Sequence, residues 1–174
     1  MSFARRSDDG AAAGRMPPVI AATAHGPVAP DFVMRVRVYY EDTDAGGIVY
    51  YANWLRWFER ARTDWLRGLG FEHLRQLRET GVGFVVRDLS IDYRRPARLD
   101  EELLIDVRLI EARRATWLLG QQACRLDDPE PLVSANLRVA AVHLASGRPT
   151  GLPRDLVARA RARGAESHLV PTEE

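Results

Sequence analysis

The 174-residue sequence is short of several features that would point to particular classes of protein. Its single cysteine, Cys124, excludes a disulfide within the chain and is typical of a protein from a reducing compartment. The formal net charge is only +1, so the overall charge indicates neither nucleic-acid binding nor attachment to a membrane. No apolar run approaches the roughly 20 residues that span a bilayer, and we expect no membrane insertion.

The N-terminal residues also lack the apolar stretch of a secretory signal. Arg5 and Arg6 are followed by Asp8 and Asp9 rather than by a continuous apolar segment. We therefore expect a cytoplasmic protein. Charged residues make up 28% of the chain and hydrophobic ones 46%, a balance that is typical of soluble globular proteins, and the length suits one domain with a sizeable core.

Three segments of different character divide the chain. Residues 1–30 are rich in Ala, Gly and Pro without a sustained period, which predicts a disordered N-terminal tail. Residues 31–165 are predicted to form one folded domain, and residues 166–174 to form a frayed C-terminal tail.

Within this domain the pattern predicts one strand, a long helix and then four more strands. Apolar and charged residues alternate over 32–40, whereas apolar residues over 53–69 recur at three- and four-residue steps, with Asn53 as the predicted N-cap. A shorter helix is expected near 71–79. The remaining predictions are strands over 84–94, 101–112, 114–125 and 132–145, a turn at 127–131 and a terminal helix at 153–162.

The long helix is too rich in tryptophan to bury its apolar face alone. A curved antiparallel sheet that wraps around the helix would cover this face, which places the chain in the α+β class. Long strands would also leave exposed edges, and exposed edges favour pairing with a second subunit. We therefore expect a homodimer or a homotetramer.

The segment between the first strand and the long helix holds the best candidate for a chemical site. Residues 40–47 read Tyr-Glu-Asp-Thr-Asp-Ala-Gly-Gly and so combine carboxylates with a glycine pair. A carboxylate such as Asp44 can act as a base or a nucleophile, and the free N–H groups of a helix start can bind a developing negative charge. Gly46 and Gly47 would bring a substrate close to the main chain.

Residues 40–53, together with Trp-Phe-Glu-Arg-Ala-Arg at 57–62, resemble the hotdog-fold acyl-CoA thioesterases, in particular the 4-hydroxybenzoyl-CoA thioesterase/YbgC-like group with its tol-pal-associated members. The stretch 90–100 is similar to a second block of the family, and the resemblance covers about residues 33–160. It implies a hotdog fold, in which a curved antiparallel five-stranded sheet wraps a long central helix. It also implies hydrolysis of an acyl-CoA thioester to a free acid and coenzyme A, with no cofactor and no metal.

The resemblance implies roles for individual residues of this segment. Asp44 would be the catalytic carboxylate, acting as a nucleophile through a mixed anhydride or as a general base on water. The Tyr51 amide would stabilise the oxyanion, and Gly47 would belong to the same catalytic turn. Gly46 and Val49 are predicted to contact the substrate. Many members of the group carry histidine where this chain has Tyr51, so the expected mechanism works through a carboxylate and backbone amides.

Two arginine clusters are candidates for binding the phosphates of coenzyme A, since arginine suits phosphate recognition. One is Arg113-Arg114 in the turn between two long strands, and the resemblance favours it. The other cluster surrounds Pro96 and consists of Arg94, Arg95 and Arg98.

Other interpretations stay open at this point. Asp42 and Asp44 also suit Asx-turn or capping roles before a helix, and Asp42 is expected to orient the loop. Glu59 is a rival catalytic carboxylate on the long helix, although a salt bridge with Arg62 or a neighbour explains it more simply. The chain could also act on thioesters of an acyl-carrier protein, or could be a non-catalytic acyl-thioester binding or scaffold protein.

Overall fold

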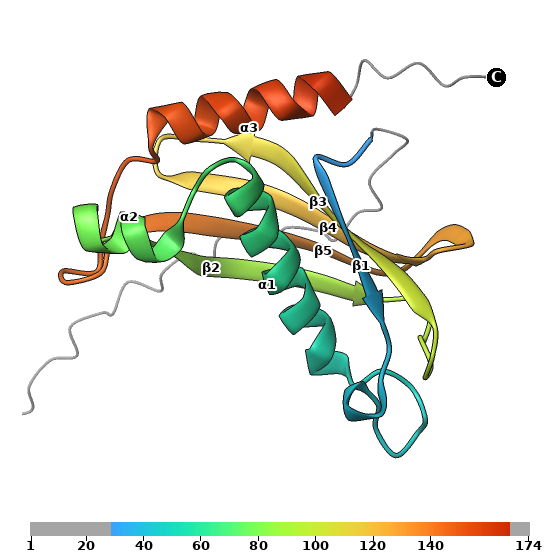
Figure 1. Cartoon of the computed structure of the whole chain (residues 1–174). Helices are drawn as coiled ribbons and strands as arrows, with labels where there is room; N and C mark the ends of the chain where they lie inside the picture. Colours follow the sequence, from blue (N-terminus) through green and yellow to red (C-terminus); the bar gives the residue numbers. More distant parts are fainter. Residues whose placement is uncertain (1–28, 168–174) are drawn as a thin grey trace, which may run out of the picture.

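A computed structural model describes residues 29–167, in which an antiparallel sheet curves around one long helix (Figure 1). The elements follow one another as β1 (Phe32–Arg37), η1 (Tyr40–Asp42), α1 (Tyr51–Gly68), α2 (His73–Thr80), β2 (Val82–Tyr93), β3 (Glu102–Ala112), β4 (Thr116–Arg125), β5 (Asp128–His143), β6 (Arg148–Pro149) and α3 (Arg154–Ser167). The strands lie in the order β1-β3-β4-β5-β2, and the two-residue β6 pairs with β5. The predicted α+β arrangement of a long helix wrapped by an antiparallel five-stranded sheet is therefore confirmed.

Helix α1 crosses the concave face of the sheet and supplies much of the core (Figure 1). Its apolar side chains recur at three- and four-residue steps, so they share one face and are buried together. On β3, the alternate residues Leu103, Ile105 and Val107 are fully buried. The buried residues of α1 are Asn53, Trp54, Trp57, Phe58, Ala61, Trp65 and Leu66.

Helix α1 begins two residues earlier than the sequence pattern indicated. Its first residue is Tyr51 and its N-cap residue is Tyr50, so the prediction of Asn53 as the N-cap was wrong. Asn53 lies inside the first turn, with its side chain directed to the preceding loop instead of to the helix amides.

The C-terminal half of the domain differs from prediction at two boundaries. Strand β5 begins at Asp128, because Arg125 pairs with Asp128 across a tight hairpin where the sequence suggested a turn over 127–131. The Arg95 guanidinium binds the Asp128 carboxylate at 2.7 Å and attaches this end of β5 to the loop after β2. Helix α3 continues to Ser167, beyond its predicted end.

The predicted tails fall mostly outside the described residues, which exclude 1–28 and 168–174. None of the helices between residues 29 and 167 is both long enough and apolar enough to cross a membrane.

Candidate active site

The loop between η1 and α1 folds back on itself and places Asp44 at its bend. The Asp44 N–H donates to the Ile48 carbonyl at 3.0 Å, and the Gly47 N–H donates to the Asp44 carbonyl at 2.9 Å. Thr43 and Val49 form an isolated antiparallel bridge at the base of the loop. Gly47 has a φ of 71°, a left-handed conformation that glycine adopts without a steric penalty. The glycine therefore permits the tight turn that the sequence indicated.

The Asp44 carboxylate is held by its own turn. Its Oδ1 accepts a hydrogen bond from the Gly46 N–H at 2.8 Å, whereas its Oδ2 has no hydrogen-bond donor among residues 29–167. A Cβ atom on Gly46 would lie 3.0 Å from Oδ1, so only glycine leaves the carboxylate undisturbed. Asp44 is exposed in the single protomer. One carboxylate oxygen is thus fixed, and the other is available for reaction.

Helix α1 follows the loop directly and presents two amides without partners. The Tyr50 N–H donates to the Asp42 carbonyl at 2.8 Å, but the N–H groups of Tyr51 and Ala52 have no acceptor within the described part of the chain. The first turn contains no acidic residue. Unpaired amides at a helix start carry partial positive charge, so this end of α1 can stabilise an anion.

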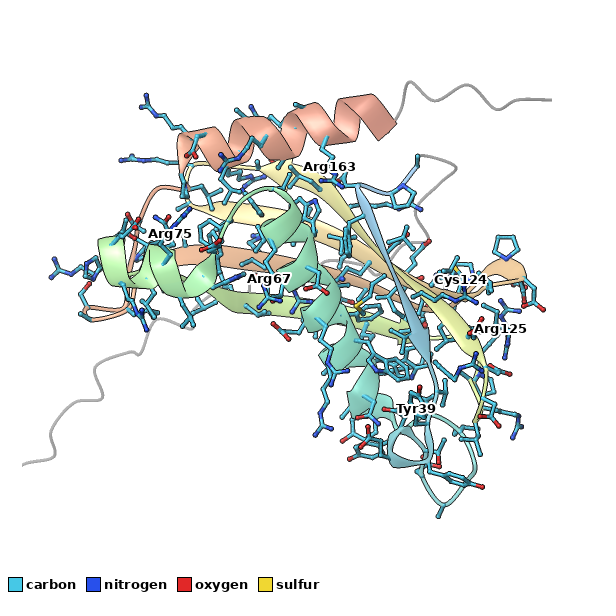
Figure 2. The ribbon with its side chains drawn as sticks, in the orientation of Figure 1. Tyr39, Arg67, Arg75, Cys124, Arg125 and Arg163 are labelled. Carbon is cyan, nitrogen blue, oxygen red and sulfur yellow. The ribbon has the colours of Figure 1, made fainter. Side chains whose placement is uncertain are left out.

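Two tyrosines, Tyr50 and Tyr51, stand at the start of the helix. The pKa of the Tyr50 phenol is raised, first by its hydrogen bond with Tyr51 and to a smaller extent by the negative charge of Asp44. The rings of Tyr50 and Tyr51 lie 4.6 Å apart. Figure 2 shows Tyr39 beside the loop that leads into α1. All five tyrosines of the chain are exposed, and the site contains or adjoins each of them: Tyr39, Tyr40, Tyr50, Tyr51 and Tyr93.

A pocket of about 320 Å³ opens beside the helix start, and its wall includes Val49, Tyr51, Trp54 and Tyr93. The Tyr93 hydroxyl donates to the Tyr51 carbonyl at 3.2 Å, so the end of β2 is tied to the first turn of α1. Burial, followed by the charge of Tyr51, raises the pKa of Tyr93. The Val49 N–H donates a hydrogen bond to the Ala97 carbonyl at 2.9 Å, so this amide is not available to a ligand. Val49 contributes to the pocket wall. The pocket is therefore mainly apolar next to the unpaired amides.

The five predicted residues of the loop and helix start come together in this turn, and the two arginine clusters separate. Arg94 and Arg95 line the same pocket, and Arg98 is exposed without a side-chain partner among residues 29–167. Arg113 and Arg114 lie beyond the far end of β3, whose 11 residues span roughly 30 Å. Within one protomer, only the cluster around Pro96 is near Asp44.

A second pocket of about 320 Å³ lies along the C-terminal half of α1, and its wall includes Glu59, Arg62 and His73. The predicted salt bridge between Glu59 and Arg62 is not formed among the described residues. Arg62 instead turns toward β4 and donates to the Gln121 Oε1 at 2.7 Å, while Glu59 accepts a hydrogen bond from Thr63 at 2.7 Å. Burial lowers the pKa of Arg62 to about 10. Glu59 is thus engaged on the helix surface, away from the Asp44 turn.

Two further residues of the site, Asn53 and Tyr93, lie in the stretches that carry the family resemblance, but the sequence did not predict either of them as a site residue. Asn53 looked like a cap, and Tyr93 lay in a strand pattern whose distance from the helix start could not be read from spacing. Among residues 29–167, no group of three or more His, Cys, Asp or Glu side chains is placed to hold a metal ion.

Comparison with known proteins identifies the family of the chain. Residues 38–160 match the model of the thioesterase-like superfamily. The chain is 43% identical to the acyl-CoA thioesterase YbgC of Haemophilus influenzae, over 73% of this chain and 92% of that protein. It is 39% identical to the acyl-CoA thioester hydrolase YbgC of Escherichia coli O157:H7, over 71% of this chain and 90% of that one.

Solved structures share the same architecture. The crystal structure of a probable thioesterase from Bartonella henselae is 33% identical, with a TM-score of 0.65 over 70% of this chain and 98% of that chain. A 4-hydroxybenzoyl CoA thioesterase complexed with 4-hydroxybenzoyl CoA is 22% identical, with a TM-score of 0.68 over 74% of this chain and 96% of that chain, and it supports the hotdog fold alone. The family match includes both the Asp44 loop and all of α1. This chain therefore belongs to the thioesterase-like superfamily and has its hotdog fold, with YbgC proteins among its relatives.

Proposed function

We propose that the protein is an acyl-CoA thioesterase, which hydrolyses an acyl-CoA thioester to a free carboxylic acid and coenzyme A. The observation that carries this proposal is the juxtaposition of a carboxylate with one free oxygen, on Asp44, and the unpaired amides of Tyr51 and Ala52. The names of the YbgC relatives support the same reaction class.

Asp44 supplies the attacking oxygen by one of two routes. As a nucleophile, its carboxylate attacks the thioester carbonyl carbon and expels the thiolate of coenzyme A, and water then hydrolyses the mixed anhydride. As a general base, it takes a proton from water, which attacks the carbonyl, and the departing thiolate receives the proton. In both routes the carbonyl oxygen becomes negative, and the Tyr51 amide donates a hydrogen bond to it. This role needs only the Tyr51 backbone, so a histidine side chain is not required.

We assign coenzyme A phosphates in the same protomer to the arginines around Pro96, because Arg94 and Arg95 line the pocket beside Tyr51. Arg94 and Arg95 already form ion pairs with Asp92 and Asp128, so Arg98 is the arginine of this cluster free to bind a phosphate. The predicted pair Arg113 and Arg114 would reach a nucleotide only from another subunit.

We further propose a homodimer that forms through β2. This strand has 12 residues and pairs only with β5 in the described part of the chain, and its exposed side chains include Val85, Val86 and Leu89. Two copies pairing antiparallel would place the Tyr93 end of one strand beside the partner's Val82. The exposed Asp44 turn of one subunit would then lie next to the partner's second pocket, which runs along the C-terminal half of α1. The turn would thereby lose contact with water. Such desolvation strengthens electrostatic interactions at the site.

The oligomer is tested by light scattering on the parent and on Val86→Lys. The parent is expected to have the mass of a dimer or a dimer of dimers, and the variant is expected to have the mass of a monomer. A parent that is monomeric at micromolar concentration would remove the dimer from the proposal.

The reaction is tested by steady-state hydrolysis of a panel of acyl-CoA thioesters, with thiol release as the readout. The parent is expected to hydrolyse at least part of the panel, and Asp44→Asn to lose about 100-fold or more in kcat. Asp155→Asn, at an exposed carboxylate in the first turn of α3, is the matched control and should retain the parental rate. Full kcat in Asp44→Asn on every substrate would exclude Asp44 as the reacting group.

Thioesters of acyl-carrier protein added to this panel, and calorimetry of acyl-CoA binding, separate the alternatives. Activity only on thioesters of acyl-carrier protein would identify a carrier-directed thioesterase, and tight acyl-CoA binding without thiol release would identify a binding or scaffold protein. The single free cysteine suits a reducing compartment, and we place the reaction in the cytoplasm.

A further inference from the structure

Asn53 is a buried polar side chain with an unusual partner for its position. It lies in the first turn of α1 and is 4% exposed. Its Nδ2–H donates to the Asp42 carbonyl at 2.9 Å, and its Oδ1 accepts a hydrogen bond from Arg56 at 3.3 Å. The side chain therefore reaches back to the loop before the helix and satisfies none of the helix's own amides.

The Asp42 carbonyl receives two hydrogen bonds from the start of α1. Besides Asn53, the Tyr50 N–H donates to it at 2.8 Å. The side chain of Asp42 is also engaged, because its Oδ2 accepts a hydrogen bond from the Tyr39 N–H at 2.9 Å. Asp42 is thus joined both to Tyr39, two residues after β1, and to the start of α1, as expected for a residue that orients the loop.

We infer that Asn53 is a positioning residue, which sets the Asp44 carboxylate at its working distance from the Tyr51 amide. Asp44 lies two residues after Asp42, and Tyr51 lies two residues before Asn53. The bond between Asn53 and Asp42 therefore closes the ring of chain that contains both reacting parts. This inference rests on the proposed function, since it concerns the geometry of that reaction. A displacement of about 1 Å between reacting groups can lower a rate by about 100-fold.

The test measures kcat, KM and thermal stability for Asn53→Ala on the best acyl-CoA substrate. Without the side-chain amide, only the Tyr50 N–H still joins the helix start to the Asp42 carbonyl. The Asp44 carboxylate can then move relative to the helix. We expect a loss of about 10- to 100-fold in kcat, with KM within about threefold of the parental value. The matched control is Asn136→Ala, which also removes a buried amide, but on β5 opposite Ser90 and outside the wall of the pocket beside Tyr51. It should lower the melting temperature and leave kcat unchanged.

A second variant, Asn53→Asp, is tested through the pH dependence of its kcat, which should not change if Asn53 has only a structural role. Its carboxyl group can donate to the Asp42 carbonyl only when protonated. The ratio of its kcat to the parental kcat should therefore rise as the pH falls, whereas the ratio for Asn53→Ala should stay constant with pH. Asn53→Asp also provides the test if Asn53→Ala does not fold.

The outcomes separate this inference from the proposed function. If Asp44→Asn is inactive while Asn53→Ala is folded and keeps full kcat, the positioning role is wrong and the reaction assignment stands. A pH-independent ratio for Asn53→Asp would equally contradict the positioning role. If Asp44→Asn keeps full kcat, the proposed function fails whatever Asn53 does.

Discussion

The two ends of helix α1 are held by different interactions, packed aromatic rings at the C-terminal end and hydrogen bonds at the N-terminal end. At the C-terminal end the fully buried Trp65 packs against Trp117 at 5.2 Å, and Trp117 stacks on Phe84 at 5.8 Å. At the N-terminal end hydrogen bonds from Tyr50 and Asn53 join the helix to the loop that carries Asp44, the proposed catalytic carboxylate. In Figure 2, Tyr39 marks the N-terminal end of α1, and Arg67 and Arg163 mark its C-terminal end.

Packing and hydrogen bonding respond to substitution in different ways. A packed aromatic cluster is sensitive to lost volume but spreads a small shift over many contacts. A hydrogen-bonded turn buries little apolar surface, yet a shift of a fraction of an ångström changes the reacting geometry. Substitutions at the C-terminal end should therefore change the free energy of unfolding, and those at the N-terminal end should change kcat.

The largest effect is expected from Trp65→Ala, at the C-terminal end of α1, on the free energy of unfolding. The truncation leaves a cavity in the aromatic cluster and should lower the free energy of unfolding by about 3–5 kcal/mol, measured by urea denaturation. The folded fraction should retain the parental kcat. Leu74→Ala, at a residue that is 70% exposed, is the control and should change the free energy of unfolding little. A loss of kcat in folded Trp65→Ala would show that the two ends are not independent.

The glycine pair offers a finer test within the N-terminal end. In Gly46→Ala the new Cβ lies 3.0 Å from the Asp44 carboxylate and must displace it, so kcat should fall by about 10-fold with little change in stability. In Gly47→Ala the Cβ meets no atom within 4 Å, but φ is 71°, so the free energy of unfolding should fall by about 1 kcal/mol. Steady-state kinetics and urea denaturation are measured on both variants. If both variants showed the same change in kcat and the same change in the free energy of unfolding, the separate roles given to Gly46 and Gly47 would be refuted.

The two arginine clusters are distinguished by the KM for an acyl-CoA substrate. Arg98 is exposed near the site, so Arg98→Ala should raise KM by about two- to fivefold, and added salt should reduce the difference. The double variant Arg113→Ala/Arg114→Ala should raise KM only if these two arginines bind the nucleotide of a substrate held in the site of a neighbouring subunit. A larger increase in that variant than in Arg98→Ala would assign the phosphates to the turn after β3.

The smallest expected effect is the pH dependence of stability from His73, in the pocket at the C-terminal half of α1. Burial, then the nearby charge of Arg67, lowers the pKa of His73 below 6.5. Between that lowered pKa and 6.5 the unfolded chain binds more protons than the folded one, so the free energy of unfolding rises with pH across this window. His73→Gln should flatten that part of the profile in urea denaturation, whereas Leu74→Ala, at an exposed position of the same helix, should not. An unchanged profile in His73→Gln would contradict this assignment.

Much of the architecture could be predicted from the sequence, because the spacing of apolar residues indicates which face of a helix or strand is buried. The tryptophans of α1 and the alternation along β3 each identify a face, and a face that must be buried restricts the fold. Asn53 shows where this reasoning stops. An Asn before an apolar helix pattern is typical of an N-cap, yet the Asp42 carbonyl lies within its reach and takes its amide instead. Arg62 is similar, because its partner Gln121 is 59 residues away on another element.

The sequence by itself determined the α+β class, the long helix in a curved sheet, and the carboxylate and glycines at one strand-helix boundary. These follow from neighbours along the chain, where side-chain period and backbone freedom act locally. Only the tertiary structure decided that Asn53 and Tyr93 meet the loop and helix start, and that Arg94 rather than Arg113 lies near Asp44 in one protomer. Those contacts depend on how strands of many residues are paired and curved, and small changes in register or twist move their ends by several ångströms.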